Sequence, residues 1–170
     1  MASDEDEPLI GENAPTYRRA WKEWKHRGES DQARAGEALG VLHGLIGVER
    51  DMIAALDAAR SRHRDQLWDH LRTGHADRVA ALGRAADGLG GLRFEGDERP
   101  GMLPRDAEDI EFLEGNALIE AVEADHCAVI DRYEEAQSSL GHHPTVRSLL
   151  EKLTEEARAD AEEIRGHGGG

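Results

Sequence analysis

Residues 117–133 read ALIEAVEADHCAVIDRY, and this stretch decides the interpretation of the whole fold. Its apolar residues recur at steps of three, four and seven, the spacing that places side chains on one face of an α-helix. His126 lies at the centre of that apolar face, and Glu123 lies about 60° to one side of it, at about 100° per residue. The pattern predicts a helix that directs an imidazole, with a carboxylate beside it, into a protein core.

The same helical spacing appears in three further parts of the sequence. We expect four long helices, over residues 30–59, 62–89, 105–140 and 144–165. The apolar face of the third begins at Phe112, and Pro144 suits the first turn of the fourth. Segments rich in Gly and Pro separate the later helices. The join between the first two, AARSRHRD at 58–65, contains neither residue, and without a turn there the two would form a single rod.

Composition supports an all-α protein of one domain. The chain has 170 residues, of which 34% are charged and only 4% are aromatic, as is typical of helices with one apolar stripe and a charged outer face. The formal charge of -15 leaves no basic surface for phosphates, which argues against nucleic acid and against an anionic membrane as partners.

The sequence predicts a cytoplasmic location. Cys127 is the single cysteine, so no disulfide within the chain is possible, which fits a reducing compartment. The first residues are acidic and lack the basic start and apolar run of a signal peptide. No apolar stretch approaches the roughly 20 residues needed to span a bilayer.

The N-terminal part carries a second amphipathic pattern. Trp21 and Trp24 lie on one side of a predicted short helix. This helix either caps the end of the helical bundle or acts as a docking arm, which would form a contact between copies in a homo-oligomer. The predicted layout is a disordered acidic segment at 1–13, a short amphipathic helix at 14–28, a four-helix bundle at 30–165 and a flexible tail at 166–170.

A polar residue interrupts the apolar face of each of the first three long helices. Glu49 is central in the first and His75 in the second, as His126 is in the third. The fourth has Asp160 at one edge and Glu156 on the opposite flank. At 1.5 Å per residue, turns near residues 62 and 141 would bring these positions to one level along the helix axes.

An antiparallel up-down-up-down four-helix bundle, preceded by the short N-terminal helix, would bring four side chains into one central layer, with Glu156 or Asp160 nearby. The four are Glu49, His75, Glu123 and His126. The candidate metal ligands are Glu49, His75, Glu123, His126 and Glu156.

A divalent metal ion gives this layer one physical explanation. An isolated carboxylate in an apolar core costs several kcal/mol unless it is paired, protonated or bound to a cation. A mixed shell of carboxylates and imidazoles suits iron, manganese or zinc. The alternative is a metal-free polar network, in which Glu49 pairs with His75 or Arg72. Tyr133, two turns after His126, belongs to the core in either case, with a supporting role beside the metal if the protein is an oxidase.

Residues 42–59 and 114–165 resemble the ferritin-like superfamily of four-helix bundles, in particular small bacterial ferritin-like proteins of unassigned function. Di-iron members use one Glu from each of two helices and an ExxH motif from each of the others. By this resemblance Glu49 matches a single-Glu position, and Glu123 with His126 matches one ExxH. The second helix departs from the pattern, since it offers Arg72 and His75 where the second ExxH belongs. The departure favours a mononuclear site or a bundle that has lost its metal.

The resemblance implies a metal-binding protein concerned with iron handling or oxidative stress; if it is an enzyme, it is an iron-dependent oxidoreductase. The alternative is a non-catalytic bundle that acts as an interaction or structural protein. A hemerythrin-like oxygen carrier is a third hypothesis, for which His126 with Asp131 matches only one piece of the site.

Overall fold

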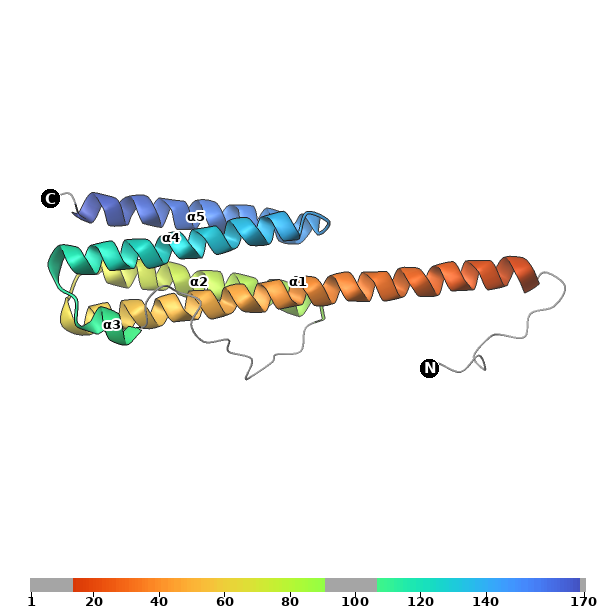
Figure 1. The fold of residues 1–170 in the computed structure, drawn as a ribbon, viewed down its shortest axis with the longest axis horizontal. Coiled ribbons are helices and arrows are strands. Elements are labelled where there is room, and N and C mark those ends of the chain that lie inside the picture. Colours follow the sequence, from red (N-terminus) through yellow and green to blue (C-terminus); the bar gives the residue numbers. More distant parts are fainter. Residues whose placement is uncertain (1–13, 91–106, 169–170) are drawn as a thin grey trace. The chain divides into compact units, whose positions relative to one another are not determined.

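The computed structural model describes the backbone of residues 14–90 and 107–168, with side chains from residue 26 onward except at residues 28 and 29. The described part is all-helical, as predicted, and contains no strand (Figure 1). Its helices are α1 (Ala14–Arg62), α2 (Gln66–Gly88), α3 (Ala107–Glu111), α4 (Gly115–Ser139) and α5 (Pro144–Gly168). None of them is both long and apolar enough to cross a membrane. The predicted disordered segment at 1–13 lies outside the described residues.

The chain divides into two units, Met1–Glu37 and Ala38–Gly170, and the packing and the site described below all belong to the second. The second unit begins at Ala38, whereas the sequence pattern places the start of the bundle at residue 30. Helical backbone continues through Gly28 and Glu29, so no separate short helix ends there. One glycine costs a helix only about 1 kcal/mol relative to alanine, which is too little to end it. The side chains of Trp21 and Trp24 lie outside the described residues, so their role in self-association stays a prediction.

The turn between the first two long helices occurs where the interpretation requires it. α1 ends at Arg62 and α2 begins at Gln66. Asp65 caps α2, because its side chain accepts a hydrogen bond of 2.9 Å from the backbone N–H of Leu67. An aspartate in this position satisfies one of the free N–H groups of a helix start, so the turn needs neither Gly nor Pro.

The expectation of one continuous helix over 105–140 is wrong. α3 ends at Glu111, and α4 begins at Gly115, whose φ is 56°. That left-handed conformation is readily available only to glycine and interrupts a right-handed helix. Phe112, predicted to be in the core, lies in the resulting turn and is 74% exposed, with the guanidinium of Arg62 5.8 Å from its ring centre.

One hydrophobic cluster is shared by α1, α2, α4 and α5. α4 and α5 pack along each other (Figure 1). α5 also contacts α2. Every residue of the apolar face predicted for the fourth helix is buried: Val146, Leu150, Leu153, Ala157, Ala161 and Ile164. The predicted apolar faces of the other three long helices contribute Leu42, Met52, Leu56, Trp68, Leu71, Leu82, Val122, Val129 and Tyr133, and the cluster also includes Ile110 of α3.

The tail predicted at 166–170 is partly helical, because α5 continues to Gly168. His167 contributes to this extension, since its Nε2 lies 2.7 Å from Oδ2 of Asp65, the capping residue of α2. The last two residues, 169 and 170, lie outside the described part of the chain.

Candidate functional site

Glu49 on α1 is the anchor of a buried polar cluster. Its side chain is 0% exposed, as is that of His75 on α2, and its Oε2 is hydrogen-bonded to His75 Nδ1. Glu49 Oε1 accepts hydrogen bonds from Arg78 Nε at 3.0 Å and from the Tyr133 hydroxyl at 2.7 Å. The predicted inward orientation and common level of Glu49 and His75 are therefore found.

The partners of Glu49 keep its carboxylate ionised in the core. Burial would raise the pKa of Glu49, but the hydrogen bond and charge of His75, together with Arg78 and Tyr133, outweigh it and hold the pKa below its usual range. Burial opposes the charge of Arg78 in the same way, and the carboxylates of Glu49 and Asp160 overcome it and raise its pKa. The core thus contains an ion pair between α1 and α2 in which both partners are charged.

His126 on α4 is held by its Nε2, which donates a hydrogen bond of 2.7 Å to the backbone carbonyl of Ala157 on α5. A carbonyl can only accept, so Nε2 carries the ring proton. Burial, followed by the effect of neighbouring His75, lowers the pKa of His126 to about 4, so the ring is neutral at pH 7. Its Nδ1 is buried with a lone pair and has no hydrogen-bond partner among the described residues.

His75 presents a second buried ring nitrogen. Its Nδ1 is bonded to the ionised carboxylate of Glu49 and therefore carries a proton, so in the neutral form of the ring, the form that binds a metal, the lone pair is on Nε2. That nitrogen is also buried without a partner in the described part of the chain. The rings of His75 and His126 meet edge to face, with centroids 5.1 Å apart.

Asp160 on α5 completes a group that is capable of holding a metal ion. One ligand atom from each of His75, His126 and Asp160 lies within 4.8 Å of the others. The Oδ2 of Asp160 also accepts a hydrogen bond of 2.9 Å from Arg78 Nη1, which fixes the position of its carboxylate. Ligands that surround a metal at about 2.1 Å lie nearer to one another than this upper limit, so the three side chains would move closer together around a bound ion.

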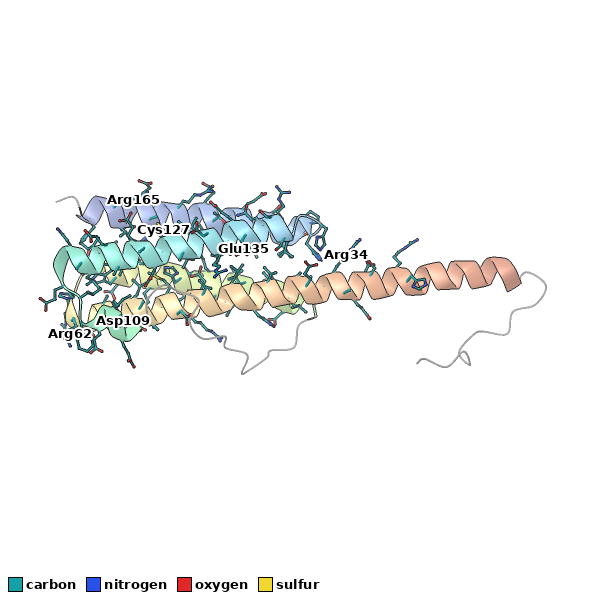
Figure 2. All side chains as sticks on the ribbon, in the orientation of Figure 1. Arg34, Arg62, Asp109, Cys127, Glu135 and Arg165 are labelled. Carbon is teal, nitrogen blue, oxygen red and sulfur yellow. The ribbon has the colours of Figure 1, made fainter. Side chains whose placement is uncertain are left out.

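Two of the five predicted ligands do not join this cluster. Glu123 lies at the edge of α4, where its Oε1 is 2.7 Å from Nε of Arg165, the residue labelled on α5 in Figure 2. Glu156 is exposed and lies 3.6 Å from Lys152 Nζ. The predicted level of Glu156 along α5 is right, because the next residue, Ala157, contacts His126. The predicted inward direction of Glu156 is wrong, because a step of one residue turns a helix by about 100° and Ala157 takes the inward position.

Sequence reasoning missed the role of Arg78, which joins Glu49 to Asp160 and is only 2% exposed. The signal was its position three residues after His75, on the same face of α2. Arg72, which the sequence offered as the partner of Glu49, instead pairs with Asp57 at 2.6 Å in a partly exposed position. Tyr133 lies in the core as predicted and, in addition, donates to Glu49.

The stability of the metal-free protein should depend on His126 at mildly acidic pH. The unfolded chain takes up a proton near pH 6.5, whereas folded His126 takes it up only at about pH 4. The folded state binds fewer protons between these values, so the free energy of unfolding should fall as pH falls, by about 3 kcal/mol in total at about 1.4 kcal/mol per pH unit. Urea unfolding with EDTA present, at pH 7.0, 5.5 and 4.5, measures this loss.

Glutamine at position 126 provides the control, since its amide N–H is able to donate to the Ala157 carbonyl without titrating. Between pH 6.5 and 4.5 the stability of His126→Gln should fall less steeply than that of the wild type. Below pH 4.5 both proteins should lose the contribution of Glu49, whose lowered pKa acts in the same direction. Parallel pH profiles throughout would show that His126 is not the group responsible.

No protein-family model matches the chain, and neither the curated proteins nor the solved structures contain a significant match. The geometry of the buried cluster therefore carries the functional argument.

Proposed function

We propose that this chain binds one divalent transition-metal ion between His75 Nε2, His126 Nδ1 and the carboxylate of Asp160. We further propose that α1, α2, α4 and α5 form an up-down-up-down four-helix bundle of ferritin-like type. The bundle is supported by the shared hydrophobic cluster. It is also supported by the contact of Glu49 with His75 across the α1–α2 turn and of His126 with Ala157 across the α4–α5 turn.

The observation that carries the metal proposal is a pair of buried ring nitrogens, His75 Nε2 and His126 Nδ1, that have no hydrogen-bond partner among the described residues. Leaving a buried polar atom unpaired costs about 1–3 kcal/mol, so two of them close together call for a shared partner. Metal-binding histidines commonly donate their other N–H to a carboxylate or a backbone carbonyl, which fixes the ring and its tautomer. Glu49 and the Ala157 carbonyl perform these two functions here.

The proposed ligand set differs from that of the di-iron members of the ferritin-like superfamily. Glu49 supports His75 instead of binding the ion, and Glu123 is engaged with Arg165, so the ExxH pair is not used as a pair. Two imidazoles and one carboxylate suit iron, manganese or zinc and leave coordination positions open. Iron bound there would supply reactivity towards oxygen or peroxide, the basis for a role in iron handling or oxidative stress.

The charge of the cluster is compatible with a divalent ion. Glu49 and Asp160 contribute two negative charges, and Arg78 contributes one positive charge. With both imidazoles in the neutral form that binds a metal, the cluster would have a net charge of -1, and a divalent ion would bring it to +1. Arg78 contacts both carboxylates and so fixes the positions of Glu49 and Asp160.

A metal-free structural network is the second candidate function of the same residues. It is favoured by Arg78, because this guanidinium already neutralises Glu49 and Asp160 without any added ion. On this alternative the layer fixes the register of the helices, and the protein acts through its surface as an interaction or structural protein.

Cobalt binding separates the two candidates, because Co²⁺ reports its ligands through visible absorption. Wild-type protein treated with chelator and then titrated with Co²⁺ should bind one equivalent with histidine-type absorption bands. Asp160→Asn and His126→Ala should lose that binding, whereas Glu123→Gln and Glu156→Gln, matched carboxylate changes on the same two helices, should retain it. Failure of the folded wild type to bind Co²⁺, Zn²⁺, Mn²⁺ or Fe²⁺ would support the structural network instead.

A further inference from the structure

A second group of potential metal ligands lies at the surface beside the buried cluster. One ligand atom from each of His70 on α2, Asp160 and Glu163 on α5 lies within 4.8 Å of the others. His70 Nε2 is 3.3 Å from Glu163 Oε2, and these two side chains are 64% and 48% exposed. One imidazole and two carboxylates at such distances suit a divalent cation that keeps part of its water shell.

Asp160 belongs to both groups, and it is the member of the buried cluster that reaches solvent. Its side chain is 13% exposed, whereas His75 and His126 are 0% exposed. An ion that approaches the two buried ring nitrogens along this side of the fold therefore meets Asp160 first. The Asp160 carboxylate therefore lies between the exposed pair His70 and Glu163 and the buried pair His75 and His126.

Gly74 leaves space beside Asp160 on the α2 side of the cluster. A Cβ atom built on Gly74 would lie 3.4 Å from Asp160 Oδ2 and 3.5 Å from Arg78 Nη1, in ordinary contact with both. Glycine here leaves room next to Asp160, between His70 one turn earlier and Arg78 one turn later on α2. The carboxylate is thus held by Arg78, and the absence of a side chain at Gly74 leaves space next to it.

We propose that His70, Asp160 and Glu163 form a solvent-facing site for a divalent cation, and that this outer site loads the buried site through Asp160. The inference rests on the proposed function, since an outer loading site is useful only if the buried site binds an ion. The ion is first held by His70 and Glu163 in water. It then exchanges these ligands for His75 and His126 while Asp160 remains bound, so no intermediate leaves it without a carboxylate.

The rate of Co²⁺ loading tests this proposal on the full-length protein. Stopped-flow absorption would follow the appearance of the inner-site bands in wild-type protein and in His70→Ala/Glu163→Gln. We expect about tenfold slower loading in the variant, the lower end of the range over which local charge changes association rates. Release to EDTA should slow by the same factor, and the final stoichiometry and Kd should be unchanged, because the outer ligands are not part of the final site.

The matched control is His142→Ala/Glu162→Gln, which makes the same two chemical changes at exposed positions outside the cluster. It should load like the wild type. Equal loading rates in the test and control variants would overturn the proposed loading route and leave the proposal of a buried metal site unaffected. Loss of the final cobalt signal in His70→Ala/Glu163→Gln would also overturn it, because these residues would then be ligands at equilibrium. A wild-type protein that binds no cobalt would instead refute the proposed function itself.

Discussion

Replacing Arg78 by methionine is expected to destabilise the protein by about 3–5 kcal/mol, the range observed when one partner of a buried ion pair is removed. The guanidinium is 2% exposed and supports two carboxylates at once, Glu49 at 3.0 Å and Asp160 at 2.9 Å. Methionine fills similar space but leaves Glu49 charged in the core with only His75 and Tyr133 as partners. Urea unfolding of metal-free protein at pH 7.5 measures the loss.

A double-mutant cycle assigns this loss to the ion pair. Glu49→Leu should also be strongly destabilising, since it leaves Arg78 without its most buried acceptor and the Tyr133 hydroxyl without its hydrogen bond. The double variant Glu49→Leu/Arg78→Met should lose less than the sum of the single changes, because neither charge then remains without its partner.

Arg72→Met is the matched control, since it removes the same group from the same helix. Arg72 pairs with Asp57 in a partly exposed position, so its loss should have a much smaller effect than that of Arg78. Equal effects of the two arginine substitutions, or strict additivity in the cycle, would show that the buried pair does not hold the helices together.

The position of polar residues along the helices could be predicted because it depends only on counting. Glu49 and His75 are at similar distances from the α1–α2 turn, and His126 is at the level of Ala157 on α5. The apolar faces were predictable for the same reason, since burying one stripe of each helix is the main source of their stability. This logic yields the level of the site and its two histidines.

The rotation of each helix about its own axis was harder to predict from the sequence than the level of each residue along the helix. A rotation of a few tens of degrees decides whether a residue at the edge of a stripe faces the core or water. Glu123 was therefore assigned to the core but lies beside Arg165, and Asp160, seen as an edge residue, contacts Arg78. Long side chains add to this uncertainty, because Arg78 reaches two helices from a position that helical spacing alone describes as ordinary.

Local backbone conformation was a third source of error. Periodicity continues across residues 105–140, yet the helix is interrupted because Gly115 adopts a positive φ of 56°. A single glycine signals such a conformation weakly, since most glycines in helices do not adopt it. The interruption exposes Phe112 and leaves the ligand-bearing part of α4, including His126, undisturbed.

Binding of Zn²⁺ is expected to raise the free energy of unfolding by about 4 kcal/mol when free Zn²⁺ is 1,000 times its Kd, since an ion that binds only the folded state stabilises it by RT ln(1 + [Zn²⁺]/Kd). The unfolded chain separates His75, His126 and Asp160 along the sequence, so it has no preformed site to compete. Thermal unfolding followed by circular dichroism, with EDTA or with graded Zn²⁺, measures the shift.

Two variants show whether that stabilisation comes from the buried cluster. Asp160→Asn keeps an oxygen acceptor for Arg78 and is the milder way to remove a ligand, so it should fold and lose most of the zinc dependence. His142→Ala removes an exposed histidine in the α4–α5 turn and should keep the full effect. Stabilisation that persists in Asp160→Asn but disappears in His142→Ala would assign the zinc to the turn. The buried histidines would then be left with the structural role that Glu49 and Arg78 support without any metal.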